Sequence, residues 1–140
     1  MTERGEGRGR QVARWLLMLV YAIAGVGHLV ATGAMVAIVP SWVPAPHLVV
    51  IATGLCELAG VVALMTPRWR RAAGWAFAAY AVCVYPANVQ HAIIDLGQGT
   101  GLGPGYHLPR LLFQPIFVWW ALWATRLVDW PFARRGQTAT

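Results

Sequence analysis

Charge is scarce in this sequence, and lysine is absent from it. Charged residues make up 11% of the 140 residues, hydrophobic residues make up 58%, and the mean hydropathy is +0.53. Soluble domains carry about 25% charged residues, so the composition excludes an ordinary soluble domain and indicates an integral membrane protein. All eleven basic residues are arginines that punctuate apolar runs, and nucleic acid is therefore not an expected partner.

Cysteine is also scarce, which limits metal and redox chemistry. Cys56 and Cys83 lie in apolar segments without a CxxC or CxxxH spacing, so the sequence predicts no zinc site and no thioredoxin-type motif. We expect two buried free thiols. Neither a metal ion nor a cofactor is required by any other pattern in the chain.

Four long apolar runs dominate what the sequence does contain. Because about 20 apolar residues cross a hydrocarbon core of about 30 Å, each run predicts a transmembrane helix. The predicted fold is all-α, an integral membrane four-helix bundle with up-down-up-down topology. The first run is too long for a signal peptide and lacks a clean cleavage site, so we interpret it as an anchor. The four predicted spans are 15–39, 48–66, 72–94 and 111–128.

The connecting segments and arginines predict the orientation of this bundle. Residues 40–47 are rich in proline and residues 95–109 in glycine, so both are expected to be loops. Every arginine except Arg110 falls in the tail 1–14, in the turn 67–71 or near the C-terminal tail 129–140. By the positive-inside rule both termini are predicted to be cytoplasmic. The predicted location is a bacterial plasma membrane, which the chain crosses several times and where membrane lipids contact it.

Small residues are expected where helices approach one another closely. The candidates in this sequence are Gly25, Gly54, Gly60 and Gly74.

Each predicted helix also carries one stripe of polar residues. A charged group in hydrocarbon is costly unless it faces a bundle interior or a water-filled cavity, so the stripes should converge. A rise of about 1.5 Å per residue places all of them in the outer half of the bundle. The sequence therefore predicts an outward-opening polar cavity lined by His28, Glu57, Asn88, His91, Arg110 and Gln114.

Simpler structural roles compete with this prediction. A histidine or an asparagine between membrane helices often serves as interhelical glue, and Arg110 can act as an interfacial side chain. Pro86 can kink the third helix without any function. Glu57 differs, because an acid inside the membrane marks a functional site more often than a structural one.

The motifs AGVGHL, IVPSWVPAPHLV, GLCELAGVVALMTPRWRR, VYPANVQHA and RLLFQP form a distinctive set. As a set, over about Tyr21 to Ala124, the chain resembles the DoxX-like family of small four-helix bacterial membrane proteins. The resemblance implies the fold and the membrane location, and the family is named for a relationship to a membrane subunit of thiosulfate:quinone oxidoreductase. It also implies recurrent polar positions at His28, Glu57, Asn88, Arg110 and Gln114, but no established catalytic assignment.

Three functions remain open at this point. The first is acid–base chemistry, such as isomerisation, cyclisation or hydration, on an apolar small molecule. Glu57 and His28 would be catalytic in that case, and Asn88, His91, Arg110 and Gln114 would bind substrate.

The second function, which the resemblance suggests, is that of a redox subunit related to thiosulfate:quinone oxidoreductase, one that binds quinone or helps in thiosulfate oxidation. Cys56 and Cys83 lie at similar predicted depths, but a thiolate is disfavoured in hydrocarbon. His28 and His91 differ by about 8 Å in depth, which is awkward for two axial haem ligands. The third function is a noncatalytic scaffold or transport subunit, working as a homo-oligomer or with a membrane complex partner.

Overall fold

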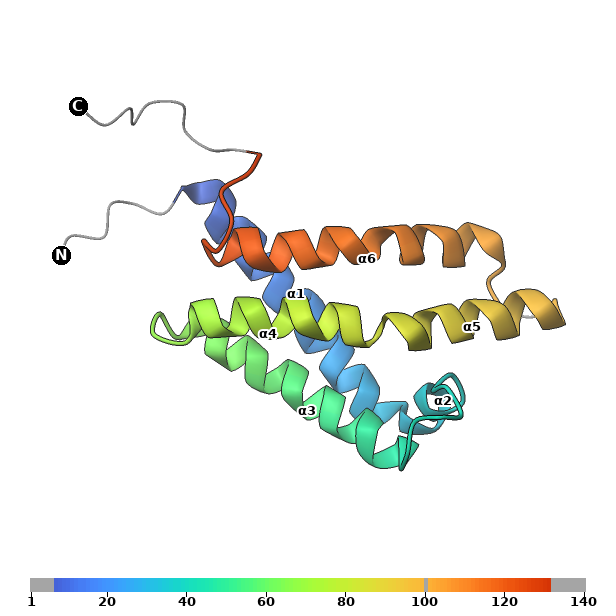
Figure 1. Cartoon of the computed structure of the whole chain (residues 1–140). Coiled ribbons are helices and arrows are strands. Elements are labelled where there is room, and N and C mark those ends of the chain that lie inside the picture. The colour runs from blue at the N-terminus through green and yellow to red at the C-terminus, as the bar shows by residue number, and fades with distance from the viewer. Residues whose placement is uncertain (1–6, 100, 132–140) are drawn as a thin grey trace, which may run out of the picture.

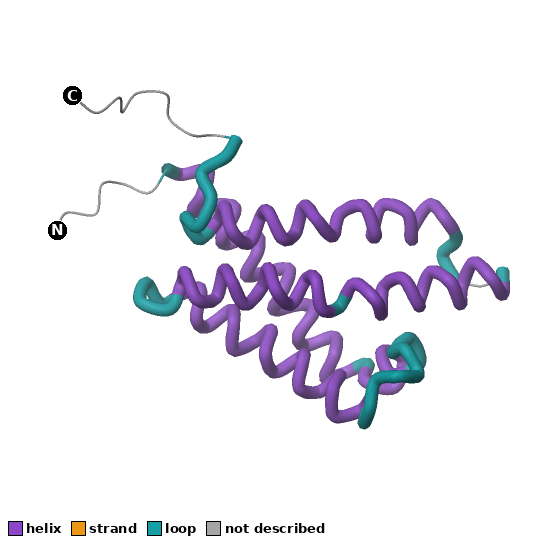
Figure 2. The backbone as a smooth tube through the Cα atoms, viewed as in Figure 1, coloured by secondary structure: helices purple, strands orange, loops and turns teal. Residues whose placement is uncertain are grey.

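A computed structural model describes residues 7–99 and 101–131, and within these ranges the chain is helical with no β-strand. Figure 2 shows the helices as purple tube and the short connections in teal. The all-α prediction is confirmed. The helices are α1 (Arg8–Val30), α2 (Thr32–Val36), α3 (Pro46–Met65), α4 (Arg70–Cys83), α5 (Tyr85–Gln98) and α6 (Pro104–Ala124).

The first predicted span differs from the structure at both ends. Helix α1 begins at Arg8, inside the predicted N-terminal tail, and ends at Val30 instead of continuing to residue 39. After a break at Ala31 the chain forms the short helix α2. The predicted tails also include residues 1–6 and 132–140, which lie outside the described residues. The second span, α3, starts two residues before the predicted one and ends one residue earlier.

The third predicted span is divided at a single residue. Val84 separates α4 from α5, and Pro86 occupies the first turn of α5. A proline in the first turn of a helix needs no hydrogen-bond partner for its nitrogen, whereas in a helix interior it clashes with the preceding turn. The structure therefore has a break two residues before Pro86, where the sequence allowed a kink.

The segment 95–109, predicted as a loop, is mostly helical, and that prediction is wrong. Helix α5 continues to Gln98, where Gly99 caps it with a left-handed conformation (φ 62°). Helix α6 starts at Pro104, directly after Gly103 at φ 70°. Glycine beyond a helix end and proline at a helix start restrict the true loop to the few residues between them.

Successive helices run back and forth between two ends of the molecule (Figure 1). The start of α1, the turn between α3 and α4, and the end of α6 lie at one end. The end of α1 with α2, the start of α3, the end of α5 and the start of α6 lie at the other. Helices α1 and α3 cross each other, and α6 lies alongside both α4 and α5.

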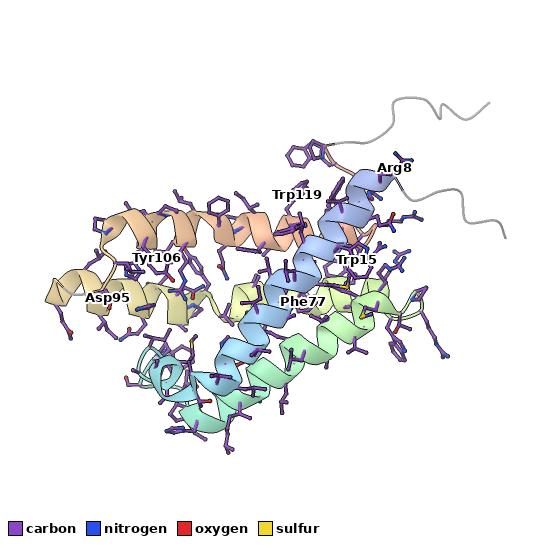
Figure 3. All side chains as sticks on the ribbon, turned by 180° about the vertical axis from the view of Figure 1, so that it is seen from behind. Arg8, Trp15, Phe77, Asp95, Tyr106 and Trp119 are labelled. Atoms are coloured by element: carbon purple, nitrogen blue, oxygen red, sulfur yellow. The ribbon has the colours of Figure 1, made fainter. Side chains whose placement is uncertain are left out.

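The hydrophobic core lies toward the end that contains the α3–α4 turn. Phe77 of α4 is 3% exposed, and its ring stacks on that of Tyr21 with centroids 3.9 Å apart. Figure 3 shows Phe77 near the middle of the molecule, where α1 passes α4. The buried cluster comprises Leu17, Met18, Tyr21, Leu64, Ala73, Phe77, Ala78, Ala121 and Ala124.

Glycine permits the closest helix contacts, as predicted. A Cβ atom on Gly25 would lie 2.9 Å from Leu58 Cγ and 3.0 Å from the carbonyl oxygen of Gly54. Gly60 packs against the Phe77 ring and Gly74 against Thr125, both too closely for a side chain. All four predicted glycines therefore lie at close helix contacts.

The outer faces of the helices are apolar. Large hydrophobic side chains are more than half exposed on α1, α3, α4 and α6, for example Ile23 (65%), Val62 (63%), Val82 (61%) and Leu112 (72%). Among the described helices, α1 and α3 are each long and apolar enough to cross a membrane.

Two glycines of α1 make a matched test of this packing. We expect Gly25→Ala to destabilise the protein by about 1–3 kcal/mol, because the new methyl group meets Leu58 and the α3 backbone. Gly27→Ala meets nothing within 4 Å and should stabilise α1 by about 0.5–1 kcal/mol through helix propensity. Denaturant titration followed by circular dichroism would measure both, and equal effects would contradict the close crossing of α1 and α3.

Candidate functional site

The crossing of α1 and α3 brings His28 and Glu57 together. Gly54 faces His28 at this crossing, because a Cβ on Gly54 would lie 2.9 Å from His28 Cβ. Side chains lean toward the N-terminus of their own helix, so on two antiparallel helices His28 and Glu57 lean toward each other. His28 Nδ1 lies 3.0 Å from Glu57 Oε2.

Glu57 is deeply buried and incompletely hydrogen-bonded. Its exposed fraction is 2%, and Oε2 has no well-directed hydrogen-bond donor. The Nδ1 hydrogen of His28 is directed at the carbonyl oxygen of Ala24, 2.9 Å away, so its closeness to Oε2 is a contact without good hydrogen-bond geometry. The hydroxyl of Tyr80 also interacts with the Glu57 carboxyl group. Because the carbonyl oxygen of Ala24 can only accept, the hydrogen of a neutral His28 ring lies on Nδ1. Nε2 then carries the lone pair and can accept a hydrogen bond.

A directional chain of hydrogen bonds connects α5, α6 and α4. Arg110 donates to Asn88 Oδ1 at 2.6 Å, and Asn88 Nδ2 donates to Gln114 Oε1 at 3.3 Å. Gln114 Nε2 then donates at 2.6 Å to the carbonyl oxygen of Ala81, in the last turn of α4 before the break. Since arginine can only donate, it fixes the orientation of both amides.

These groups share a cavity of about 920 Å³ with the His28–Glu57 pair. Its walls come from α1, α2, the segment 38–43 and α3 to α6, and most of them are apolar. Five of the six residues predicted to converge line the cavity: His28, Glu57, Asn88, Arg110 and Gln114.

His91 does not line this cavity, and that part of the predicted lining is wrong. It contacts Arg110 instead, because Arg110 Nη1 lies 2.7 Å from His91 Nδ1. His91 faces away from the cavity toward Asp95, whose Oδ2 lies 3.3 Å from His91 Nε2 and 3.0 Å from His107 Nε2. It therefore belongs to a second cluster, joined to the cavity through Arg110.

Sequence reasoning missed His107 because residues 95–109 were expected to form a loop. The proline at position 104, directly after a glycine, was the signal for a helix start that would have placed His107 on the first turn of α6. Tyr80, which interacts with Glu57, was missed because an aromatic residue in an apolar helix gives no distinct signal.

The two cysteines are both free, as predicted, but both are exposed. The expectation of buried thiols is wrong because the helices of this chain have apolar outer faces, and an apolar sequence context does not show which way a side chain points. Cys83 lines the cavity and Cys56 does not, so the cavity does not bring the two thiols together.

Comparison with known proteins places this arrangement in a family. A family model described as a domain of unknown function (DUF8561) matches residues 17–125. The chain belongs to this family. The matched residues of this chain include both partners of the His28–Glu57 pair and the whole hydrogen-bond chain from Arg110 to Ala81. No curated protein and no solved structure matches the chain significantly.

Proposed function

We propose that this protein spans a membrane several times, binds an apolar small molecule with a polar end group, and performs acid–base chemistry on it with Glu57 and His28. The apolar outer faces support membrane insertion, since large apolar side chains such as Ile23 and Val62 are more than 60% exposed. In this proposal α1 and α3 are two spans, α4 and α5 together form a third broken span, and α6 is the fourth. That arrangement is an up-down-up-down membrane bundle, as the resemblance to DoxX-like proteins implies.

The arginines support an orientation with the ends of the described chain in the cytoplasm. Arg8, Arg10 and Arg14 lie in the first two turns of α1, and Arg126 follows α6. Three more arginines lie in the α3–α4 turn and at the start of α4. These elements lie at one end of the molecule, whereas Arg110 lies in the half of α6 near the opposite end (Figure 1). The positive-inside rule then assigns the first end to the cytoplasm of a bacterial plasma membrane.

The observation on which the chemistry rests is the burial of Glu57 at the cavity. A carboxyl oxygen with no hydrogen-bond partner inside a protein destabilises the fold, so its position is better explained by a ligand that needs it. His28 supplies a second proton carrier 3.0 Å away, with Nε2 able to accept a proton.

Arg110 supplies the polar recognition in this proposal. Its guanidinium group is hydrogen-bonded to Asn88 and His91, both neutral acceptors, and no carboxylate among the described residues forms an ion pair with it. A carboxylate, phosphate or carbonyl oxygen on the ligand would find a donor there, and the apolar walls would hold the rest of the molecule.

Gentle extraction followed by native mass spectrometry tests the ligand-binding step. We expect the full chain, extracted in lipid nanodiscs, to retain an apolar small molecule with a polar end group. Ala87→Trp, which places a large ring at the cavity wall, should reduce the retained molecule at least about tenfold. Val62→Trp adds the same ring on the outer face of α3, where the residue is 63% exposed, and should change nothing. Equal retention in the two variants would refute the cavity as the binding site.

A further inference from the structure

The second cluster, at the end of the molecule opposite the arginine-rich end, has the composition of a metal site. It consists of His91 and Asp95, four residues apart on α5, and His107 on the first turn of α6. Figure 3 shows Asp95 and Tyr106, the neighbour of His107, at the end of the molecule away from Arg8. One potential ligand atom from each of the three residues lies within 4.8 Å of the other two.

The distances between these ligand atoms are within a few tenths of an ångström of those in a tetrahedral site. Zn²⁺ binds histidine nitrogen and carboxylate oxygen at about 2.0–2.2 Å, so two ligand atoms of a tetrahedral site lie about 3.3–3.6 Å apart. Asp95 Oδ2 lies 3.3 Å from His91 Nε2 and 3.0 Å from His107 Nε2. The rings of the two histidines lie edge to face, with centroids 4.9 Å apart and an interplanar angle of 80°.

The backbone packs closely around this cluster, and one of its buried nitrogens is unpaired within the described part of the chain. Gly101, at φ 70°, packs its backbone against the Asp95 carboxylate too closely for any side chain. His107 is 1% exposed, and its Nε2 makes a 3.0 Å hydrogen bond to Asp95 Oδ2. Its Nδ1 has no hydrogen-bond partner among the described residues, so this buried imidazole is paired through Nε2 alone. The His91 and Asp95 side chains keep 25% and 15% exposure, which gives an ion a route from solvent.

Arg110 couples this cluster to the cavity. Because arginine only donates, the Nδ1 atom of His91 carries no hydrogen, and neutral His91 has its hydrogen on Nε2. A metal ion that binds His91 needs the Nε2 lone pair, so the ring hydrogen must move to Nδ1. There it would point at the Arg110 Nη1 group, which is also a donor. A bound ion and the Arg110–His91 hydrogen bond are therefore mutually exclusive.

We propose that His91, Asp95 and His107 bind a divalent cation of the zinc type through Nε2, Oδ2 and Nε2, and that the bound cation displaces Arg110 from His91. The fourth coordination position is left to water. The displaced guanidinium keeps its hydrogen bond to Asn88 and its contact with the Tyr106 ring, 5.7 Å away, and the Nη1 hydrogen released from His91 can be donated to a cavity ligand. This inference does not depend on the acid–base proposal, because Glu57 is not part of the cluster.

Titration of the chelator-stripped, tag-free full chain in detergent with Zn²⁺, by calorimetry, tests the site. We expect one Zn²⁺ per chain, and Co²⁺ in its place should give the visible absorption of a tetrahedral ion. Asp95→Asn and His107→Gln should each weaken Zn²⁺ binding by about 100-fold or more. His47→Gln, an exposed histidine at the start of α3, should leave it unchanged.

Arg110→Gln gives the distinguishing result. It removes a positive charge beside the ion and supplies an amide oxygen that can accept the Nδ1 hydrogen, so Zn²⁺ should bind about tenfold more tightly. No saturable binding by the wild type, or full affinity in Asp95→Asn and His107→Gln, would overturn the site. Unchanged or weaker binding by Arg110→Gln would overturn the displacement of Arg110. Circular dichroism checks the fold of each variant. If His107→Gln does not fold, the nearly isosteric Asp95→Asn still tests the site.

Discussion

Glu57→Gln is expected to slow proton exchange on the cavity ligand by about 10²–10⁴-fold, the usual contribution of a positioned acid or base. The side chains have the same shape, so the α1–α3 crossing should be preserved while the ionisable group is lost. Incubation of the protein with its co-purified ligand in D₂O would measure the effect without knowledge of the overall reaction. Wild-type protein should introduce deuterium at an acidic carbon of the ligand, as read by mass spectrometry.

Asp129→Asn is the matched control for this experiment. Asp129 is another acid, but its side chain is 70% exposed. It pairs with Arg10 at the arginine-rich end of the molecule and does not line the cavity. We expect deuterium incorporation to be unchanged in this variant. If Glu57→Gln exchanges as fast as wild type while still binding the ligand, the acid–base assignment is wrong and a binding or transport role is favoured.

Phe77→Ala is expected to destabilise the protein by about 3 kcal/mol or more, as removal of a buried aromatic ring usually does. The ring stacks on Tyr21 of α1 and packs against Gly60 of α3, so it joins α4 to both. Its loss leaves a cavity lined by three helices, which cannot all move inward together. Denaturant unfolding of the detergent-solubilised chain, followed by circular dichroism, would measure the change.

Trp75→Ala provides the comparison on the same helix. Trp75 is larger than Phe77 but 61% exposed, so its removal should change the free energy of unfolding by about 0.5 kcal/mol or less. Similar losses in the two variants would show that the described core around Phe77 does not hold the helices together.

Helix content and close helix contacts could be predicted from the sequence because both depend on local composition. Apolar runs longer than a soluble helix requires indicated α1 and α3, and Gly25, Gly54, Gly60 and Gly74 marked the contacts. Pro86 marked the break in the third span because a proline ring clashes with the preceding turn wherever it occurs. The short loop after Gln98 was mispredicted because the glycines that end α5 and precede α6 resembled a long flexible segment.

The convergence of polar residues was predictable only in part. Helical period and depth brought His28, Glu57, Asn88, Arg110 and Gln114 to one level, and these five do line the cavity. Depth alone could not separate His91 from them, because depth does not specify which neighbouring helix a side chain meets, and the helix is broken at Val84 before it reaches His91. His91 was therefore assigned to the cavity, although it contacts Arg110 from the other side.

The sequence by itself determined that this chain is helical, that its helices have apolar outer faces, and that each brings a few polar groups to the same level. These properties follow from composition and from the 3.6-residue period, which act within one helix. Only the tertiary structure decided which groups meet. His28 contacts Glu57 because two glycines let α1 and α3 cross closely, and Arg110 connects two clusters because α6 begins early enough to carry His107 beside α5. Such pairings depend on the relative placement of whole helices, which no local pattern specifies.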